Sequence, residues 1–218
     1  QFLAAQRHSE QTITNLVFMG MGEPMLNYDN TMKAVEIFTH KDAQILGARR
    51  ITLSTAGMVA GIRRMADERR PIKLALSLHA TTDGLRTQLM PINKKHNLRE
   101  LGEAIEYYYR KTGSPVTYEY ILFEGLNDGD EDARRLQRIA RRAPSKINVI
   151  PFHPIDFTNP EGLSATLRPT SPERFRAFIE RLRALDVTVM IRSSSGKDIQ
   201  AACGQLALAQ EAAANASA

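Results

Sequence analysis

The clearest indication of the fold is the segment Lys73-Leu74-Ala75-Leu76-Ser77-Leu78-His79-Ala80. It is a short, nearly continuous apolar run, which is typical of a strand in a parallel sheet covered on its faces. Small and polar residues follow it directly. The stretch therefore predicts a buried strand at 73–78 that ends at a polar rim.

Five similar apolar, β-branched runs occur along the chain, at 15–19, 51–54, 116–122, 147–151 and 187–191. Segments with helical spacing separate them, at 30–39, 98–111, 130–142 and 171–185. The last opens with Ser171-Pro172-Glu173, an N-cap followed by proline in the first turn. This alternation predicts an α/β fold with parallel strands joined by right-handed crossovers. A partial barrel and an open doubly wound sheet both fit this alternation. No Gly-rich nucleotide fingerprint follows the first strand.

Composition narrows the class of protein. The chain has 218 residues, 43% of them hydrophobic, which is enough to bury a core. No stretch approaches the roughly 20 apolar residues that span a bilayer. The single cysteine excludes an internal disulfide and a thiol-rich metal cage, and it suits a cytoplasmic protein. The net charge of +5 is compatible with a polyanionic partner, although paired basic residues are usually solvated helix faces.

Ligands of α/β folds collect where the strands end, so the residues just past each strand are the candidate site. Small and polar residues gather there, at 20–24, 54–57, 77–80, 124–128, 152–154 and 192–196. Polar and small residues arranged around the strand ends in this way suit a ligand with an amino acid end, a ribose and a base. Each residue also has an ordinary interpretation: Glu23 as a surface carboxylate, Ser54 as a helix cap, His79 as a core imidazole and Cys203 as a small buried residue.

Taken together, five blocks of sequence are far more specific. They are Gly20-Met21-Gly22-Glu23-Pro24 with Asn27, Ser54-Thr55-Ala56-Gly57, Ser77-Leu78-His79-Ala80, Pro91-Ile92-Asn93-Lys94-Lys95, and the run from Gly196 to Leu206 that contains Ala202-Cys203-Gly204. In this order they resemble the adenine-C2 RNA methyltransferases of the radical S-adenosylmethionine (SAM) superfamily. The resemblance covers about 15–206. It implies a partial (βα) barrel of the radical SAM type at 1–206, with a mostly parallel sheet, helices outside and the first strand missing. A frayed or disordered tail is expected at 207–218.

The resemblance also implies which residues bind SAM. Glu23, with Gly22, would accept the methionine ammonium in a charge-assisted hydrogen bond. The rest of the pocket would be lined by Ser54, Ser77, Leu78 and His79. His153 stands where the family commonly has asparagine, and an imidazole can still donate or accept one hydrogen bond.

Cys203 matches the family's methyl-carrying cysteine. The implied mechanism has two stages. The Cys203 thiolate takes a methyl group from one SAM. A second SAM is then cleaved reductively by a [4Fe–4S] cluster, and the deoxyadenosyl radical removes hydrogen from the S-methyl group. The resulting methylene radical adds to adenine C2. The implied partners are ribosomal RNA, transfer RNA and an electron donor such as flavodoxin, and the protein is expected to be a monomer. The target base must leave its stack to react.

Besides His153, the chain departs from the family pattern in its cysteines. The family's cluster motif of three cysteines and its resolving cysteine lie upstream of the Gly-Glu-Pro block, whereas this chain has only Cys203. The sequence is therefore expected to be a fragment that is inactive alone. Two alternatives stay open: an adenine-C8 RNA methyltransferase of the same superfamily, and a non-catalytic RNA-binding barrel without a cluster.

Overall fold

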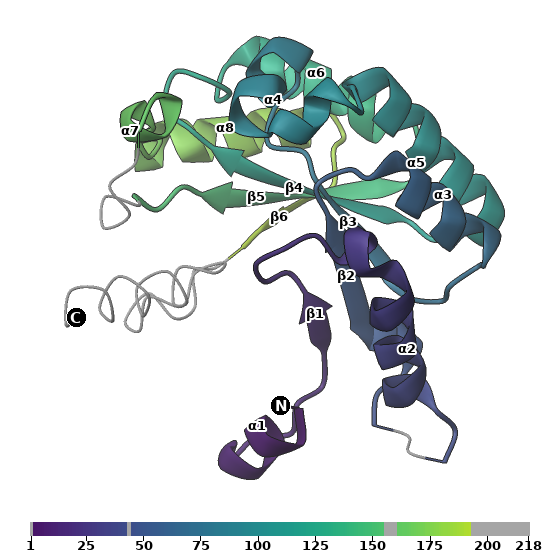
Figure 1. Ribbon diagram of the computed structural model, residues 1–218. Helices are drawn as coiled ribbons and strands as arrows, with labels where there is room; N and C mark the ends of the chain where they lie inside the picture. Colours follow the sequence, from purple (N-terminus) through teal and green to yellow (C-terminus); the bar gives the residue numbers. More distant parts are fainter. Residues whose placement is uncertain (1, 43–44, 155–160, 193–218) are drawn as a thin grey trace.

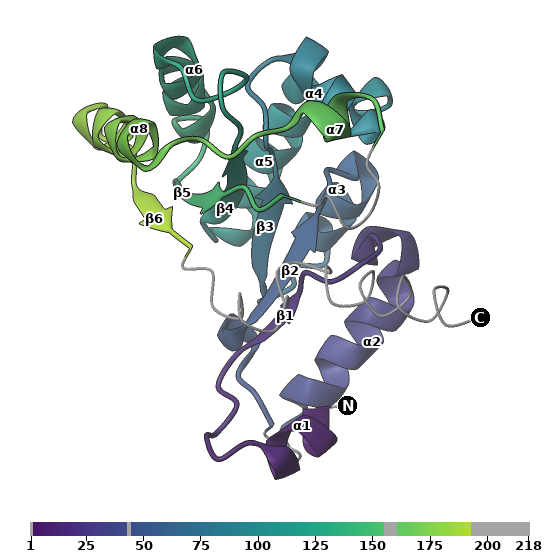
Figure 2. The ribbon, with the colours of Figure 1, turned by 90° about the vertical axis from the view of Figure 1, so that its left-hand side faces the viewer.

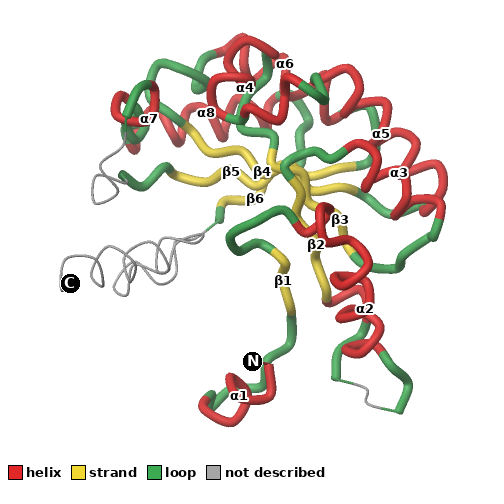
Figure 3. Tube along the Cα trace, viewed as in Figure 1, coloured by secondary structure: helices red, strands yellow, loops and turns green. Residues whose placement is uncertain are grey.

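The computed structural model describes residues 2–42, 45–154 and 161–192. Helices and strands alternate along these residues (Figures 1 and 3). The strands are β1 (Leu16–Phe18), β2 (Ile51–Thr55), β3 (Lys73–Ser77), β4 (Val116–Leu122), β5 (Ser145–Pro151) and β6 (Val189–Ile191). The helices are α1 (Phe2–His8), α2 (Tyr28–Thr39), α3 (Val59–Asp67), α4 (Asp83–Leu89), α5 (Leu98–Thr112), α6 (Asp130–Ala140), α7 (Leu163–Thr166) and α8 (Pro172–Ala184).

All six strands are parallel, and their order in the sheet is their order in the chain, β1 to β6. Every crossover therefore steps in the same direction. Because such crossovers are right-handed, the connecting helices fall on one face of the sheet. They form an arc around that face, and the strands run side by side in chain order (Figures 1 and 2). The predicted parallel α/β sheet is confirmed, and the sequential strand order favours the barrel type over the doubly wound one.

The core lies between the sheet and this arc of helices. Leu76, Tyr118 and Ile147 are in register on β3, β4 and β5, and all three are buried. They belong to a cluster that includes buried side chains of α3, α5, α6 and α8. One example of its packing is the stacking of Tyr120 on Phe178 of α8, with ring centroids 6.1 Å apart. Every second strand residue faces these helices, so the residues between them face the concave side.

Most predicted elements are present, with changes at their ends. The last strand begins at Val189 rather than at 187, because the Val187 N–H bonds the Leu182 carbonyl and closes helix α8 instead. Helix α6 ends at Ala140 rather than at 142. Ser171 is the N-cap of α8, as predicted, and its hydroxyl accepts from the Arg174 N–H.

Helices α3 and α4 were not predicted. They contain nine and seven residues, too few to show a clear helical period. In residues 2–42, 45–154 and 161–192, no helix is both long and apolar enough to cross a membrane. The end of the expected barrel at 206, the tail at 207–218 and Cys203 all lie outside the described residues.

Candidate functional site

The predicted rim is present where the first strands end. The segment after β1 lines a cavity of about 290 Å³. The lining residues are Phe18, Gly20, Met21, Gly22, Glu23, Pro24, Asn27 and Thr31. Gly22 has φ +91, a backbone conformation that side-chain-bearing residues rarely adopt. This glycine therefore has a conformational reason to precede Glu23.

Glu23 joins two of the predicted sequence blocks. Its Oε1 accepts from the Met25 N–H at 3.0 Å, and its Oε2 accepts from the Ala56 N–H, in the loop after β2, at 2.7 Å. A carboxylate offers about four acceptor positions, so two hydrogen bonds leave capacity for a cationic group. The backbone at Glu23 is extended and caps the short 3₁₀ turn Pro24–Asn27. The carboxylate is thus held in place by the protein and can still accept a ligand.

Ser54 faces the concave side of the sheet. It lies between the buried Leu53 and Thr55, and neighbouring strand residues point to opposite faces. The alternative role of Ser54 as a helix cap is wrong. The N-cap of α3 is Met58, and the Thr55 hydroxyl accepts from the Gly57 and Met58 N–H groups at 3.1 and 3.3 Å.

The segment Ser77-Leu78-His79 leaves β3 at the same rim. The N–H groups of Leu78 and His79 both donate to the Glu119 carbonyl, at 3.0 and 3.3 Å. Ser77 lies on the concave side, whereas the Leu78 side chain is buried in the core. The backbone groups of Leu78 are also engaged within the protein, because its carbonyl accepts from Arg86 and Ala80. Leu78 therefore positions this segment, and its contact with a ligand stays a prediction.

His79 is a neutral imidazole with a defined tautomer. Its Nδ1 accepts from the Ile121 N–H at 3.2 Å, which assigns the ring proton to Nε2. Burial, and to a lesser extent the nearby Arg86 charge, lower the pKa of His79 to about 4. The ring is therefore uncharged at neutral pH, and its Nε2–H is a hydrogen-bond donor. This agrees with the ordinary interpretation of a satisfied imidazole and leaves a donor for a ligand.

Arg86 organises this rim and was not predicted from the sequence. The side chain is fully buried. Its guanidinium donates to the carbonyls of Ala56 (2.7 Å) in the loop after β2, Ser77 (3.0 Å) at the end of β3 and Leu78 (3.2 Å) just after β3. It also donates to Asn93 Oδ1 at 3.0 Å. Burial lowers the pKa of Arg86 to about 10, so it remains charged at neutral pH.

Two residues of the five sequence blocks, Asn93 and Gly57, therefore have a structural explanation. Asn93, from the Pro-Ile-Asn-Lys-Lys block, orients Arg86 and donates to the Asp83 side chain at 3.0 Å. Gly57, with φ +111, has no room for a Cβ, which would lie 2.7 Å from Leu101 and 3.3 Å from Arg86. The Asn93 block was the only sequence signal that could have pointed to Arg86.

Asn127, in the loop after β4, connects the end of that strand to the same rim. Its amide donates to the carbonyls of His79 (2.8 Å) and Ile121 (2.7 Å), and its Oδ1 accepts from the Phe123 N–H at 2.7 Å. His153 follows β5 at this edge of the sheet. The structure thus brings Glu23, Ser54, Ser77 and His79 to one edge, while the assignment of His153 to a ligand stays a prediction.

The described residues do not fit an iron–sulfur cluster. They contain no group of three or more His, Cys, Asp or Glu side chains that could hold a metal ion. The sole cysteine of the sequence, Cys203, lies outside them. The thiolate ligands of a [4Fe–4S] cluster are therefore not supplied by this stretch of sequence.

A larger cavity of about 700 Å³ lies at the opposite end of the strands. Its lining includes Arg49, Arg69, Lys73, Lys111 and Lys146. It is remote from the rim described above, because Lys73 and Val116 begin β3 and β4. Size alone therefore does not identify the candidate site.

Comparisons with known proteins agree with this arrangement. The chain is 44% identical over 205 residues to the "Probable dual-specificity RNA methyltransferase RlmN" of Salinibacter ruber, covering 93% of this chain and 54% of that protein. It is 45% identical over 205 residues to the protein of the same name from Moorella thermoacetica, covering 94% and 56%. The chain thus spans little more than half the length of these curated relatives.

Solved structures give the same result. A crystal structure of a radical SAM methyltransferase from Sphaerobacter thermophilus superposes with a TM-score of 0.84 at 42% identity, covering 93% of this chain and 57% of that one. A domain of pyruvate-formate lyase-activating enzyme from Bacteroides vulgatus shares the fold, with a TM-score of 0.57 at 15% identity, covering 83% of this chain and all of that one. The sequence profile of the radical SAM superfamily matches residues 3–137. With that profile covering more than half of its residues, the chain belongs to the radical SAM superfamily.

Proposed function

We propose that the full-length protein methylates C2 of adenine in ribosomal and transfer RNA, with SAM as the methyl donor and Cys203 as the methyl carrier. We also propose that it does so as a monomer in the cytoplasm, with electrons from a donor such as flavodoxin. The observation that carries the proposal is the Glu23 carboxylate, which is bonded to the loops after β1 and β2 and keeps acceptor capacity at the rim. Superfamily membership makes SAM the ligand that such a carboxylate would recognise through its ammonium group.

Different residues of this chain would bind different parts of the SAM molecule. Glu23, with Gly22, would hold the methionine ammonium. Ser54 and Ser77 lie on the concave side and would face the remainder of the ligand, and His79 would donate from Nε2. These contacts would orient the sulfonium methyl group, and orientation of this kind lowers the barrier to transfer.

Cys203 would carry out the first chemical step. Its thiolate sulfur attacks the SAM methyl carbon, a carbon–sulfur bond forms, and the methyl–sulfonium bond breaks. S-adenosylhomocysteine leaves with the electron pair. The thiolate is the reactive form because a protonated thiol is a poor nucleophile.

One-electron chemistry distinguishes this proposal from ordinary SAM methylation. Adenine C2 is electron-poor and is not a nucleophile, so a simple displacement by the base is not available. A [4Fe–4S] cluster supplies one-electron chemistry in this superfamily, and the cluster ligands would have to come from residues that this chain does not supply. The net charge of +5 suits an RNA partner.

The experiment that tests the function is product analysis with the full-length protein. The protein, with its cluster reconstituted under anaerobic conditions, is incubated with a reductant, SAM and unmodified ribosomal or transfer RNA. Digestion and mass spectrometry against nucleoside standards are expected to give 2-methyladenosine. A product identified as 8-methyladenosine would assign the alternative reaction. RNA binding without any cleavage of SAM would instead support the non-catalytic alternative.

Glu23→Gln is expected to weaken SAM binding by about 1.5–3 kcal/mol, which is roughly a ten- to hundredfold rise in Kd. The amide is uncharged and loses the hydrogen bond between a carboxylate and an ammonium. Isothermal titration calorimetry on the full-length protein measures the change. Glu180→Gln, at an exposed position on α8, is the matched control and should bind SAM normally.

The melting temperature is recorded alongside, since the glutamine can keep only one of the two backbone hydrogen bonds that Glu23 accepts. If the Glu23→Gln protein is folded and binds SAM as tightly as the unsubstituted enzyme, Glu23 is not the ammonium partner.

A further inference from the structure

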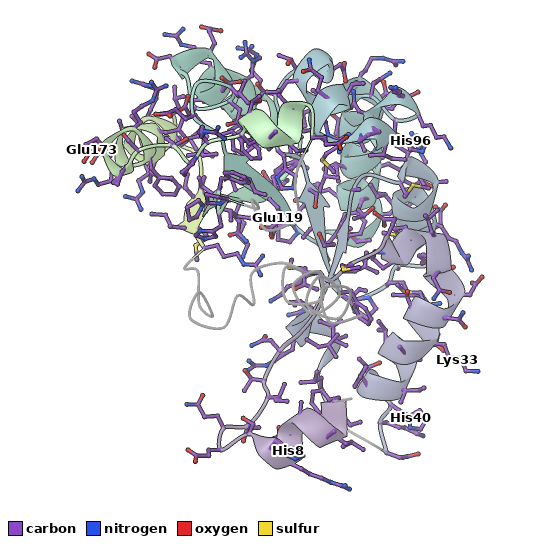
Figure 4. The ribbon with its side chains drawn as sticks, turned by 60° about the vertical axis from the view of Figure 1, so that its left-hand side comes forward. His8, Lys33, His40, His96, Glu119 and Glu173 are labelled. Atoms are coloured by element: carbon purple, nitrogen blue, oxygen red, sulfur yellow. The ribbon has the colours of Figure 1, made fainter. Side chains whose placement is uncertain are left out.

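A polar row crosses the concave face of the sheet. Ser77 on β3, Glu119 on β4 and Asn148 on β5 are in register, so their side chains point to the same side. The preceding residues on the same strands point to the opposite side and are buried in the core. They are Leu76, Tyr118 and Ile147. Glu119 lies in the interior of the molecule, whereas His96 and Glu173 lie at its periphery (Figure 4). Glu119 was not predicted from the sequence, because it lies inside an apolar run.

Glu119 is a buried carboxylate with one oxygen unused by the described residues. Its side chain is only 4% exposed. Oε1 accepts from the Asn148 amide at 3.0 Å, while Oε2 is buried and has no hydrogen-bond partner within 2–42, 45–154 and 161–192. Burial raises the pKa of Glu119, although the Asn148 hydrogen bond and the charges of Arg192 and Lys146 act in the opposite direction. A buried carboxylate oxygen without a partner is costly, which indicates that a hydrogen-bond donor completes the site.

Glu119 is also at the level of the rim. Its own carbonyl accepts the N–H groups of Leu78 and His79, the residues that leave the sheet at the end of β3. Its side chain therefore lies beside the segment that the proposed function assigns to SAM. Glu119 is the middle residue of β4, but it pairs with Ser77, the last residue of β3.

The spacing of the strands identifies which part of SAM reaches Glu119. Glu23 is bonded to the loop after β2, and Glu119 is on β4, two strands further along the sheet. Neighbouring strands are about 5 Å apart, so the two positions are separated by about 10 Å across the sheet. In extended SAM, the path from the ammonium group along the methionine chain and past the sulfonium to the ribose hydroxyl groups covers a comparable distance. With the ammonium at Glu23, the ribose would lie over β4.

We infer that Glu119, oriented by Asn148, accepts a hydrogen bond from a ribose hydroxyl group of SAM. This inference rests on the proposed SAM site. A carboxylate is a suitable partner for this group, as in dinucleotide-binding folds, where an acidic side chain accepts from the ribose hydroxyl. Asn148 uses its amide to hold Oε1, which leaves Oε2 for the ligand. Glu119 thereby distinguishes adenosyl ligands that carry the hydroxyl group from those that lack it.

The test compares Glu119→Gln with the unsubstituted full-length holoenzyme. Three ligands are titrated by calorimetry: S-adenosylhomocysteine and its 2′-deoxy and 3′-deoxy analogues. In the unsubstituted protein, loss of the contacted hydroxyl group is expected to weaken binding roughly tenfold or more. In Glu119→Gln, S-adenosylhomocysteine should bind more weakly by a similar factor, and removal of that hydroxyl group should have little further effect.

Two controls separate this role from a structural one. Glu180→Gln, at an exposed site on α8, should keep the full difference between the ligands. Glu119→Asp keeps the charge but shortens the side chain, so an intermediate loss is expected. Because glutamine is nearly isosteric and can still accept from Asn148, the Glu119→Gln protein is expected to keep its melting temperature.

The possible failures are distinguishable. If the unsubstituted holoenzyme does not bind S-adenosylhomocysteine, the proposed SAM site itself is wrong. If it binds, and Glu119→Gln weakens all three ligands equally or not at all, only the assignment of Glu119 to the ribose is overturned.

Discussion

Cys203→Ser in the full-length enzyme is expected to abolish methyl transfer to RNA and to leave SAM and RNA binding intact. Serine keeps nearly the same shape, but its hydroxyl stays protonated at neutral pH and is a far weaker nucleophile. Sulfur also stabilises a radical on the adjacent carbon through its lone pairs, so a methylated oxygen would serve less well in the second stage. Both stages of the proposed reaction therefore depend on this one sulfur.

Three measurements check this expectation. Mass spectrometry of the unsubstituted enzyme after incubation with SAM should find a methyl group on the peptide that contains Cys203. Anaerobic assays of the serine variant should yield no methylated adenine, while calorimetry shows unchanged SAM binding. If Cys203 were only a small packed residue, the serine variant would methylate RNA at the usual rate, and the proposed mechanism would be refuted.

Arg86→Met is expected to lower the free energy of unfolding by about 3–5 kcal/mol and to impair SAM binding. Methionine fills much of the same volume but donates no hydrogen bond. Three carbonyls, of Ala56, Ser77 and Leu78, would lose the donor that Arg86 provides. The Leu78 carbonyl would keep the Ala80 N–H, and each buried acceptor left unsatisfied costs about 1–3 kcal/mol. The same bonds tie together the loops after β2 and β3, so the SAM pocket should loosen as well.

Denaturant unfolding of the full-length protein measures the stability, and calorimetry measures SAM binding. Arg99→Met is the matched control, since Arg99 is on the surface of α5 and makes one ion pair, with Glu103 at 2.8 Å. Such pairs contribute at most about 1 kcal/mol. Equal unfolding midpoints for the two variants would show that Arg86 does not hold the rim together. Arg86→Lys should be intermediate, because an ammonium group keeps the charge but cannot reach all the carbonyls.

The parallel α/β fold could be predicted because its signals are local. An apolar run such as 116–122 is a strand wherever it lies in the sheet, and the strand there has these bounds. Ser171 capped its helix as predicted for the same reason, since a cap depends on residues close in the chain. The rim positions of Glu23, Ser54 and Ser77 followed from the rule that polar residues past the strands meet at one edge.

The remaining features depended on contacts between distant segments. In the sequence, Arg86 is one more arginine in a seven-residue helix, and only the folding of two rim loops around it supplies its acceptors. Glu119 is hidden in an apolar run, and the register of β4 between β3 and β5 places it beside Ser77 and Asn148. The parallel α/β class, the approximate positions of the strands and the residues of the rim could thus be predicted from the order of the amino acids alone. The strand order, the buried arginine that joins the loops and the side of the sheet that each residue faces became clear only in the folded protein, because these features depend on register and burial between segments far apart in the chain.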